Sequence, residues 1–466
     1  MERALRTLAS QIVNARERHY GVFLYKFGFH TFVRRSTEEI LVSSLHRLRR
    51  ILRHAHDTSP YYHTLWRSIG IHPDSLKLPE DIHRLPYLTK DLIEKHKHRI
   101  ISNRSRSDNL EKSHTGGSSG TPTSFFRDRR CTSMRIGRQR GILDWYGYSV
   151  GDRCGLVWGA QSDLDGAPGK VSFKKRFTKF ASGTETLECT TLDAWKMTDF
   201  HRRLQHFRPE ILYGYPSALA QFAEFLKENH LPLLTVRAIF CTAERLTDEH
   251  RTLLQETFGG EVFNLYCTRE HGCIAFECNR HKGFHIDTGS VHLEIIHDRG
   301  PLDMGQPGEI VITDLLNYGM PFIRNRIGDR GVLSPDPCDC GCPLPLLHSL
   351  EGRVSDVLYR PDGSTVTGLM LTDIRDHPTI KEVQIIQEEL SEISVLMVVS
   401  DGFGPGDTEA PIRDMKRHLG EQVNIRVRIV PEIPRNPHSG KVQEVICRIR
   451  PNPPVHHRSV MTSSAL

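Results

Sequence analysis

The eight residues 115–122 contain three glycines and four hydroxyl side chains, a composition that suits a phosphate-binding loop. Glycine lets the backbone approach a ligand closely, and hydroxyl groups can donate hydrogen bonds to phosphate oxygens. The segment lacks the Gly-Lys-Ser/Thr ending of a P-loop, which argues against a kinase or GTPase of that type. A plain Gly/Ser connection would have the same composition, so the interpretation depends on other residues. The candidate phosphate ligands are Thr115, Gly116, Gly117, Ser118, Ser119, Gly120 and Thr121.

Four further motifs follow this loop in the chain, and the last of them offers a single lysine, Lys441, on a tight turn. The five motifs, in this order and spacing, resemble the adenylate-forming superfamily of acyl-CoA synthetases, adenylation domains and luciferases. The resemblance is greatest to its phenylacetate-CoA ligase and capsule-biosynthesis-type branch, and His54–Lys90 resembles the N-terminal segment of that branch. The four motifs are Tyr266-Cys267-Thr268-Arg269-Glu270, Arg324-Asn325-Arg326-Ile327-Gly328-Asp329, Gly352-Arg353-Val354-Ser355-Asp356 and Pro434–Lys441.

The resemblance implies a reaction in which a carboxylate attacks the α-phosphate of ATP to give an acyl-adenylate and pyrophosphate. A thiol, that of coenzyme A or of a carrier-protein pantetheine, then takes the acyl group, and the sequence leaves both acceptors open. Negative charge on the phosphates favours hydrogen-bond donors, a lysine and a hard cation such as Mg²⁺. The implied roles are pyrophosphate binding by Thr115–Thr121, Mg²⁺ binding by Glu270, and ribose binding by Asp329 with Arg353. They also include contacts to adenine and the α-phosphate by Ala243, Glu244 and Tyr266, catalysis by Lys441 and a hinge at Asp356.

Three residues depart from the family pattern: Cys267 replaces a glycine, Asn325 stands where Tyr often does, and His438 lies inside the lysine turn. None of them removes a charged group that the chemistry needs. A rival hypothesis, motivated by Cys267, Asn325 and the basic charge, is a noncatalytic protein that binds nucleotide or nucleic acid. The acyl pocket is expected among 145–148, 213–217 and 240–243, although these residues are equally suited to a core.

Cysteine and histidine form a second pattern, in which Cys278 and His285 are followed by a Cys-Asp-Cys-Gly-Cys run. Thiolate and imidazole ligands in two clusters favour a closed, structural zinc site. The same branch of the family supports the set Cys278, His285, Cys338 and Cys340. Cys342, His281 and Cys273 are alternative ligands nearby.

The composition fits a soluble, multidomain enzyme: 466 residues, 38% hydrophobic and 25% charged, with a net charge of +6. The basic stretch Arg127–Arg140 is interpreted as a solvated face, and no aromatic residues interleave with it, so no nucleic-acid partner is expected. The N-terminal residues do not show the pattern of a signal peptide, and the most apolar segment among them, Gly21–Val33, is too short to span a membrane, so a cytoplasmic location is expected. The sequence does not indicate an oligomeric state.

Hydrophobic periodicity predicts an α/β fold with mixed sheets and helices, followed by a small, mobile α+β domain. Leu41, Leu45, Leu48 and Leu52 predict a helix, whereas the Pro-rich tract Ser59–Lys90 interrupts the helical pattern. The expected domains are residues 1–355 with the ATP, acyl and zinc sites, 356–450 with Lys441, and a loose tail, 451–466. Strands are expected at 123–126, 155–158, 211–213, 238–241, 262–265, 291–296, 309–313, 381–387, 393–400 and 423–429, and a helix at 410–419.

Overall fold

The computed structural model of the chain separates into two units. The first unit comprises Met1–Val354 with Pro434–Val442, and the second comprises Ser355–Ile433 with Gln443–Leu466. Within the described part of the chain, no helix combines the length and the apolar character needed to cross a membrane. The structure describes residues 2–16, 19–114, 123–159, 180–189, 192–297, 300–301, 304–353, 357–361, 365–367, 379–435 and 442–449.

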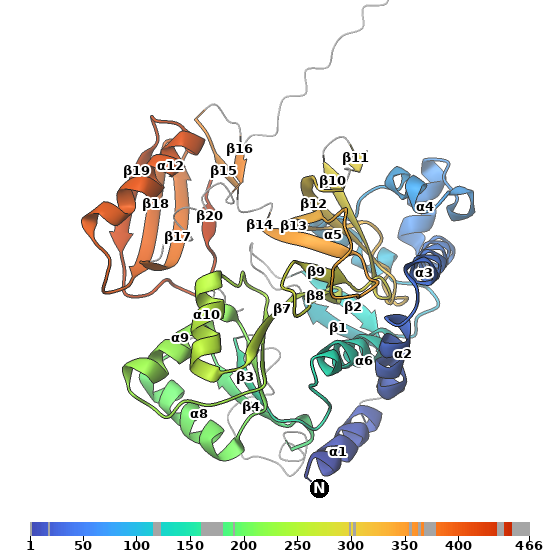
Figure 1. Cartoon of the computed structure of the whole chain (residues 1–466). Helices are drawn as coiled ribbons and strands as arrows, with labels where there is room; N and C mark the ends of the chain where they lie inside the picture. Colours follow the sequence, from blue (N-terminus) through green and yellow to red (C-terminus); the bar gives the residue numbers. More distant parts are fainter. Residues whose placement is uncertain are drawn as a thin grey trace, which may run out of the picture. The chain divides into compact units, whose positions relative to one another are not determined.

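Helices form the N-terminal part of the first unit (Figure 1). The helix predicted from the leucine repeat is present as α3, which begins with a capping box at Ser36 and Glu39. The expectation that Ser59–Lys90 lacks helix is wrong: α4 begins with Pro60 in its first turn, where proline costs no hydrogen bond. The bounds are α1 Glu2–Arg16, α2 Val22–Phe32, α3 Thr37–Thr58, α4 Pro60–Ser68, α5 Lys90–Ile100, and the short 3₁₀ turns η1 Pro73–Ser75, η2 Glu80–Arg84 and η3 Ser107–Asn109.

A parallel group of strands, β4-β3-β5-β6-β7, occupies one end of a 12-stranded sheet. Side chains alternate between its faces, as a two-residue period requires. On β6, Ile239 packs into a core shared with α8, α9 and α10, whereas Phe240 packs on α2 and α6. The bounds are β3 Cys154–Trp158, β4 Thr184–Glu188, β5 Ile211–Gly214, β6 Ala238–Thr242, β7 Glu261–Thr268, α6 Arg129–Trp145, α8 Ala194–Phe207, α9 Pro216–Glu228 and α10 Asp248–Phe258.

The rest of this sheet is antiparallel, in the order β11-β10-β12-β13-β14-β9-β8-β7. A separate hairpin, β1 with β2, comes directly before and after the phosphate-loop segment in sequence. The bounds are β1 Leu110–His114, β2 Ser124–Asp128, β8 Gly272–Glu277, β9 Phe284–Ile286, β10 Val291–His297, β11 Gly300–Pro301, β12 Pro307–Asp314, β13 Asn325–Leu333 and β14 Leu346–Arg353.

The second unit has its own four-stranded sheet, β19-β18-β17-β20, and a hydrophobic core built with α12. A short hairpin, β15 with β16, lies in the same unit. The mixed α/β architecture with a separate C-terminal α+β unit agrees with the predicted fold class. The bounds are β15 Val357–Tyr359, β16 Thr365–Thr367, β17 Ile380–Glu389, β18 Glu392–Val399, η6 Pro405–Thr408, α12 Glu409–Leu419, β19 Asn424–Ile429 and β20 Val445–Cys447.

The basic stretch on α6 is only partly a solvated face, which corrects the prediction. Arg135 and Arg138 are buried, and each is paired with a buried carboxylate, Asp314 and Asp287 respectively. Burial of an arginine is tolerated when a carboxylate satisfies its charge and its hydrogen bonds. The partners lie 179 and 149 residues away, so nothing near α6 in sequence indicates them.

Candidate active site and metal centre

The parallel strands β5, β6 and β7 end at the same edge of the sheet, where α/β proteins commonly bind ligands. Ala243 and Glu244 follow β6 directly, and Ala243 has a positive φ of 71°. The Glu244 carboxylate accepts a hydrogen bond of 2.6 Å from the hydroxyl of Ser217, at the start of α9. Its other oxygen, Oε1, is buried and has no hydrogen-bond partner among the described residues. A buried acceptor of this kind usually has a partner, so Glu244 fits a ligand that brings a donor.

Tyr266, on β7, and Asp329, on β13, lie together although 63 residues separate them in sequence. The Tyr266 hydroxyl donates a 2.7 Å hydrogen bond to Oδ2 of Asp329. In the pairing of β13 with β14, Asp329 is directly opposite Arg353. Three of the residues that the family resemblance assigns to nucleotide binding therefore lie together on one sheet. Only the backbone of Arg353 is described.

The segment that carries the catalytic-lysine candidate is closed at its base by an antiparallel bridge between Arg435 and Val442. Arg435, which belongs to the first unit, donates a 3.0 Å hydrogen bond to the Ser217 hydroxyl. Arg435, Ser217 and Glu244 thus form a continuous chain of hydrogen bonds. Lys441 and the loop residues Thr115–Thr121 lie outside the described residues, as does the proposed hinge at Asp356.

Glu270, the candidate Mg²⁺ ligand, is half-buried in the turn between β7 and β8. A buried network that the sequence did not reveal lies nearby. Asp314 pairs with Arg135 and faces the ring of His271, and the other ring nitrogen of His271 is 3.0 Å from the amide nitrogen of Asn325. Asn325, a departure from the family pattern, therefore has a defined structural role.

The predicted acyl-pocket segments contribute largely to the core. Phe240 and Tyr215 are buried, and the Tyr146 ring packs against the Phe240 ring with centroids 5.3 Å apart. Phe240 and Tyr215 are therefore interpreted as core residues. The acyl pocket itself stays a prediction.

The four predicted metal ligands, Cys278, His285, Cys338 and Cys340, come together with their ligand atoms all within 4.8 Å of one another. The Sγ atoms of Cys278 and Cys338 are 3.6 Å apart, and Sγ of Cys340 is 3.2 Å from Nε2 of His285. The other ring nitrogen, Nδ1, lies 3.4 Å from the carbonyl of Leu344. A carbonyl at Nδ1 favours the tautomer whose free Nε2 can bind a metal.

Burial and crowding favour the neutral forms of Cys278 and His285. Burial, together with the neighbouring thiols, raises the pKa of the Cys278 thiol to about 12. Burial lowers the pKa of His285, which keeps the imidazole neutral, as a metal ligand must be. Without a cation, crowded thiols resist deprotonation, whereas Zn²⁺ stabilises the thiolates. The donor set of three sulfurs and one imidazole nitrogen is one that zinc commonly takes in structural sites.

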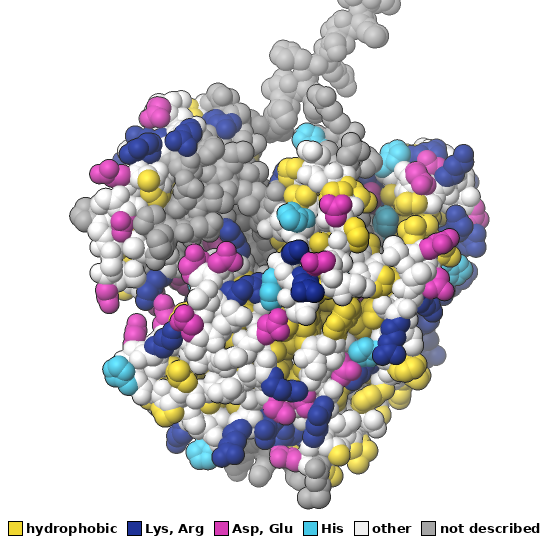
Figure 2. All heavy atoms as spheres, viewed as in Figure 1, with side chains coloured by type: hydrophobic (Ala, Val, Ile, Leu, Met, Phe, Trp, Pro, Cys, Tyr) yellow, Lys and Arg dark blue, Asp and Glu magenta, His cyan; other side chains and the backbone are white. Residues whose placement is uncertain are grey.

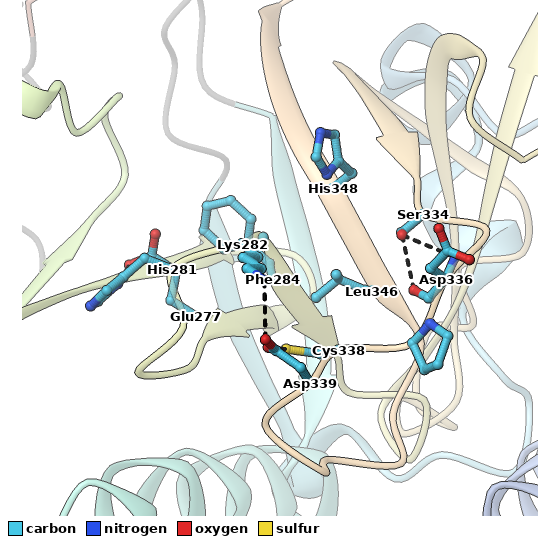
Figure 3. Close-up of a pocket in the computed structure, with 12 residues that line it drawn as sticks. Glu277, His281, Lys282, Phe284, Ser334, Asp336, Cys338, Asp339, Leu346 and His348 are labelled. Carbon is cyan, nitrogen blue, oxygen red and sulfur yellow. Dashed lines mark hydrogen bonds and ion pairs between the residues drawn. The ribbon is translucent and has the colours of Figure 1, made fainter.

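The alternative ligands are outside this group of four. Cys342 is buried in a hydrophobic core, His281 lies near Glu277 and Glu261, and Cys273 is opposite Cys267 in the β7–β8 pairing. A pocket of about 450 Å³ adjoins the cluster, with Lys282 and Asp339 paired at 3.0 Å across it (Figure 3). Cys338 lines this pocket, so one edge of the cluster lies near the surface.

Comparison with known proteins agrees with this geometry. Residues 358–448 match the model of the CapK C-terminal domain. Protein CapK of Staphylococcus aureus is 26% identical over 382 residues, which cover 79% of this chain and 81% of the relative. Phenylacetate-coenzyme A ligase of Pseudomonas putida is 24% identical over 405 residues, covering 83% and 85%. A crystal structure of 2-hydroxyisobutyryl-CoA ligase in the postadenylation state superposes with a TM-score of 0.69 at 19% identity, covering 89% of this chain and 91% of the other.

The fold is therefore that of the adenylate-forming ligases. Within that class, the relatives of this chain are CapK and the phenylacetate-coenzyme A ligases, as the motifs in the sequence predicted.

Proposed function

We propose that this protein activates a carboxylic acid with ATP as an acyl-adenylate and transfers the acyl group to the thiol of coenzyme A. The observation that carries the proposal is the 2.7 Å contact between Tyr266 and Asp329, opposite Arg353, near the strand ends that present Glu244. Adjacent hydroxyls of a ribose need an acceptor such as a carboxylate, and Tyr266 holds the carboxylate of Asp329 in one orientation. Relatives named as coenzyme A ligases support the same chemistry.

The nucleotide would lie along the carboxyl ends of β5, β6 and β7. Asp329 would accept hydrogen bonds from the ribose, and Glu244 and Ala243 would border the adenine, whose amino group is a donor for the unpaired Oε1 of Glu244. The loop Thr115–Thr121 would hold the β- and γ-phosphates. Its backbone N–H groups and hydroxyls would stabilise charge as pyrophosphate leaves.

Lys441 would neutralise charge between the incoming carboxylate and the α-phosphate, which is the group the attack makes more negative. Glu270 supplies a hard oxygen ligand of the kind that Mg²⁺ prefers, and Mg²⁺ when bound would neutralise part of the phosphate charge. We also propose that residues 356–450 act as the small mobile domain with a hinge at Asp356. Movement of that domain would let one site serve adenylation and then thiol attack.

The cluster of Cys278, His285, Cys338 and Cys340 is proposed to hold a structural Zn²⁺. Four protein ligands leave no open position for a substrate, which favours stability over catalysis. An ion here would connect the β8–β9 hairpin to the segment that precedes β14, and β14 carries Arg353.

A different acceptor is the second candidate, because CapK is among the relatives and the C-terminal residues match its domain. In that case the acyl-adenylate would form in the same way, and a carrier-protein thiol or another nucleophile would replace coenzyme A.

A panel of carboxylic acids tests the proposal through acid-dependent release of pyrophosphate, measured with and without coenzyme A. Lys441→Ala should abolish acid-dependent release, whereas Lys381→Ala, an exposed lysine of the second unit, should leave it unchanged. Pyrophosphate release that does not depend on any acid, or a Lys441→Ala variant with full activity, would contradict the proposal. Acyl-adenylate formation without transfer to coenzyme A would favour the second candidate.

A further inference from the structure

The first helix, α1, buries three polar side chains and exposes three large apolar ones. Arg6, Ser10 and Asn14 are at most 9% exposed, although they are polar. Leu5, Leu8 and Ile12 are 50–55% exposed and recur at helical spacing, so that they form one continuous stripe. Folding of the chain on itself therefore leaves an apolar face of this helix in water.

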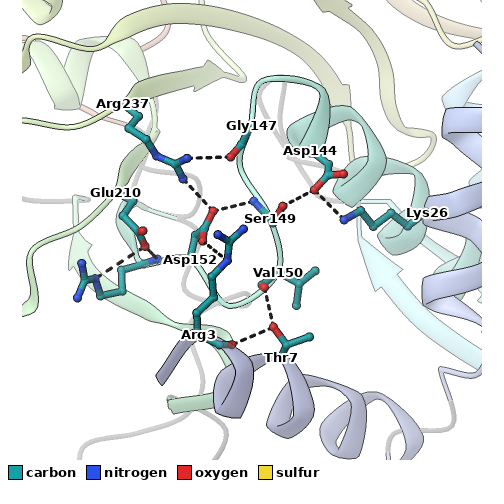
Figure 4. A network of polar contacts seen from close by, with 11 residues as sticks. Arg3, Thr7, Lys26, Asp144, Gly147, Ser149, Val150, Asp152, Glu210 and Arg237 are labelled. Carbon is teal, nitrogen blue, oxygen red and sulfur yellow. Dashed lines mark hydrogen bonds and ion pairs between the residues drawn. The ribbon is translucent and has the colours of Figure 1, made fainter. Parts of the chain in front are cut away.

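Polar contacts explain how the helix stays attached in this orientation (Figure 4). Nε of Arg3 is 2.8 Å from the buried Oδ1 of Asp152, and the Thr7 hydroxyl donates to the carbonyl of Val150 at 2.8 Å. Nη2 of Arg140 donates to the Ser10 hydroxyl at 3.1 Å. The attachment is thus specific, and it does not use the apolar stripe.

The second helix, α2, also exposes apolar side chains on its outer side. Its inner side packs tightly on α6, where a Cβ added at Gly137 would lie 2.5 Å from the carbonyl of Val22. Lys26 forms a 2.7 Å ion pair with Asp144, also on α6 (Figure 4). On the outer side, Leu24 and Phe27 are 75% and 68% exposed.

Together these side chains form what we call the N-terminal apolar face: Leu5, Leu8, Ile12, Tyr20, Leu24 and Phe27. Figure 1 shows α1 and α2 following each other along one edge of the first unit, and hydrophobic side chains gather there beside Lys and Arg in Figure 2. A contiguous exposed apolar surface with a charged border is typical of an interaction site.

Charge decides which partner fits this face. Residues 1–53 contain eleven Lys and Arg and four Glu, a net charge of +7, while the whole chain has +6. The remaining residues therefore carry a net charge of −1. Within this segment Arg3 and Lys26 are paired with Asp152 and Asp144, whereas Arg34 and Arg35, directly after α2, are exposed. A second copy of the chain would bring the same cations against these two arginines, whereas an anionic lipid surface attracts them and accepts the apolar side chains.

We propose that the N-terminal apolar face binds an anionic membrane surface, with α1 and α2 lying in the plane of the lipid headgroups. This peripheral attachment is independent of the catalytic proposal, because none of its residues belongs to the candidate active site. It would hold the protein near acids or acceptors that are embedded in the membrane.

Flotation of the full chain with lipid vesicles tests this proposal. Binding is expected on vesicles of phosphatidylcholine with a quarter phosphatidylglycerol, and much weaker binding on phosphatidylcholine alone. The variant Leu5→Ser/Leu8→Ser/Leu24→Ser/Phe27→Ser should weaken binding on the order of 100-fold, since it removes four apolar side chains from the lipid interface. Arg34→Gln/Arg35→Gln should weaken binding to the anionic vesicles by about tenfold and reduce its sensitivity to salt.

Trp195→Ser is the matched control, because Trp195 is 75% exposed on α8, away from this face in sequence. It should bind vesicles like the wild type, and circular dichroism should show that all variants are folded. Failure of the wild type to bind anionic vesicles overturns the proposal, and so does a folded quadruple variant that binds as tightly as the wild type. A wild-type dimer that the quadruple variant converts to monomer, without vesicle binding, would assign the face to a second copy instead.

Discussion

The buried ion pair between Arg324 and Glu294 should be a major source of stability in the first unit. Arg324, which immediately precedes β13, has a side chain only 1% exposed. Its Nη2 lies 2.9 Å from Oε1 of Glu294 on β10, and its Nε lies 3.1 Å from Oε2. Its Nη1 donates to the carbonyls of His83 and Leu85 at 2.8 and 2.5 Å, and its guanidinium lies 4.2 Å from the centre of the Tyr87 ring.

Replacement of Arg324 by Met would leave the Glu294 carboxylate buried without its cation. Loss of one partner of a buried pair costs about 3–5 kcal/mol. The two carbonyls lose their donor, at about 1 kcal/mol each, but neighbouring losses overlap and do not simply add. We therefore expect Arg324→Met to lower the free energy of unfolding by about 4 kcal/mol. The double variant Arg324→Met/Glu294→Met should recover about 2 kcal/mol of that loss, because no unpaired charge is then buried.

Urea unfolding followed by tryptophan fluorescence measures these changes. All four tryptophans lie between residues 66 and 195, so the signal reports the first unit alone. Arg53→Met is the control, because its pair with Asp74 is 55% exposed on the arginine side and 46% on the aspartate side, and such surface pairs contribute about 0–1 kcal/mol. If Arg324→Met and Arg53→Met cost the same, or if the double variant is no more stable than Arg324→Met, the reasoning is refuted.

Three other outcomes are expected. Elemental analysis should find about one zinc per chain, with the ion lost in Cys278→Ser and retained in Cys342→Ser; absence of zinc from the wild type would refute the site. Tyr266→Phe should raise the KM for ATP about fivefold, since it removes one hydrogen bond to Asp329 worth about 1 kcal/mol. An unchanged KM would show that the Tyr266–Asp329 hydrogen bond does not contribute to nucleotide binding. Burial disfavours the charged Asp314, but Arg135 and His271 outweigh it and lower its pKa. Stability should therefore fall as the pH drops from about 4 through that lowered value, and Asp314→Asn should unfold with a weaker pH dependence there, as urea midpoints would show.

Most of the local structure could be predicted from periodicity. The runs 211–213, 238–241 and 262–265 are strands β5, β6 and β7, and all of their residues except Asn264 are apolar or aromatic, because a parallel sheet is covered on both faces. The helix α4 was missed because Pro60, read as a break in the pattern, begins a helix instead.

The candidate metal ligands and the candidate nucleotide-binding residues could be selected from the sequence because motifs mark them. The buried arginine pairs could not, since Arg135, Arg138 and Arg324 find their carboxylates 179, 149 and 30 residues away. A run of arginines has the same sequence signature on a solvated helix face and beside buried acids. Only the fold determines which of the two applies.

The buried pair of Arg324 and Glu294 also affects the candidate nucleotide site, because it helps to fix the register of β13, the strand that carries Asp329. A slip of one residue between β13 and its neighbours would turn Asp329 to the opposite face of the sheet, away from Tyr266. Leu88 donates to the carbonyl of Arg324 at 2.9 Å and accepts from the N–H of Arg326 at 2.9 Å, so the segment around Leu88 pairs with β13 at one position only. A slipped strand would leave the charge of Glu294 buried and unpaired, at a cost of several kcal/mol. The same contacts that stabilise the first unit therefore fix the position of Asp329, the residue proposed to bind the ribose.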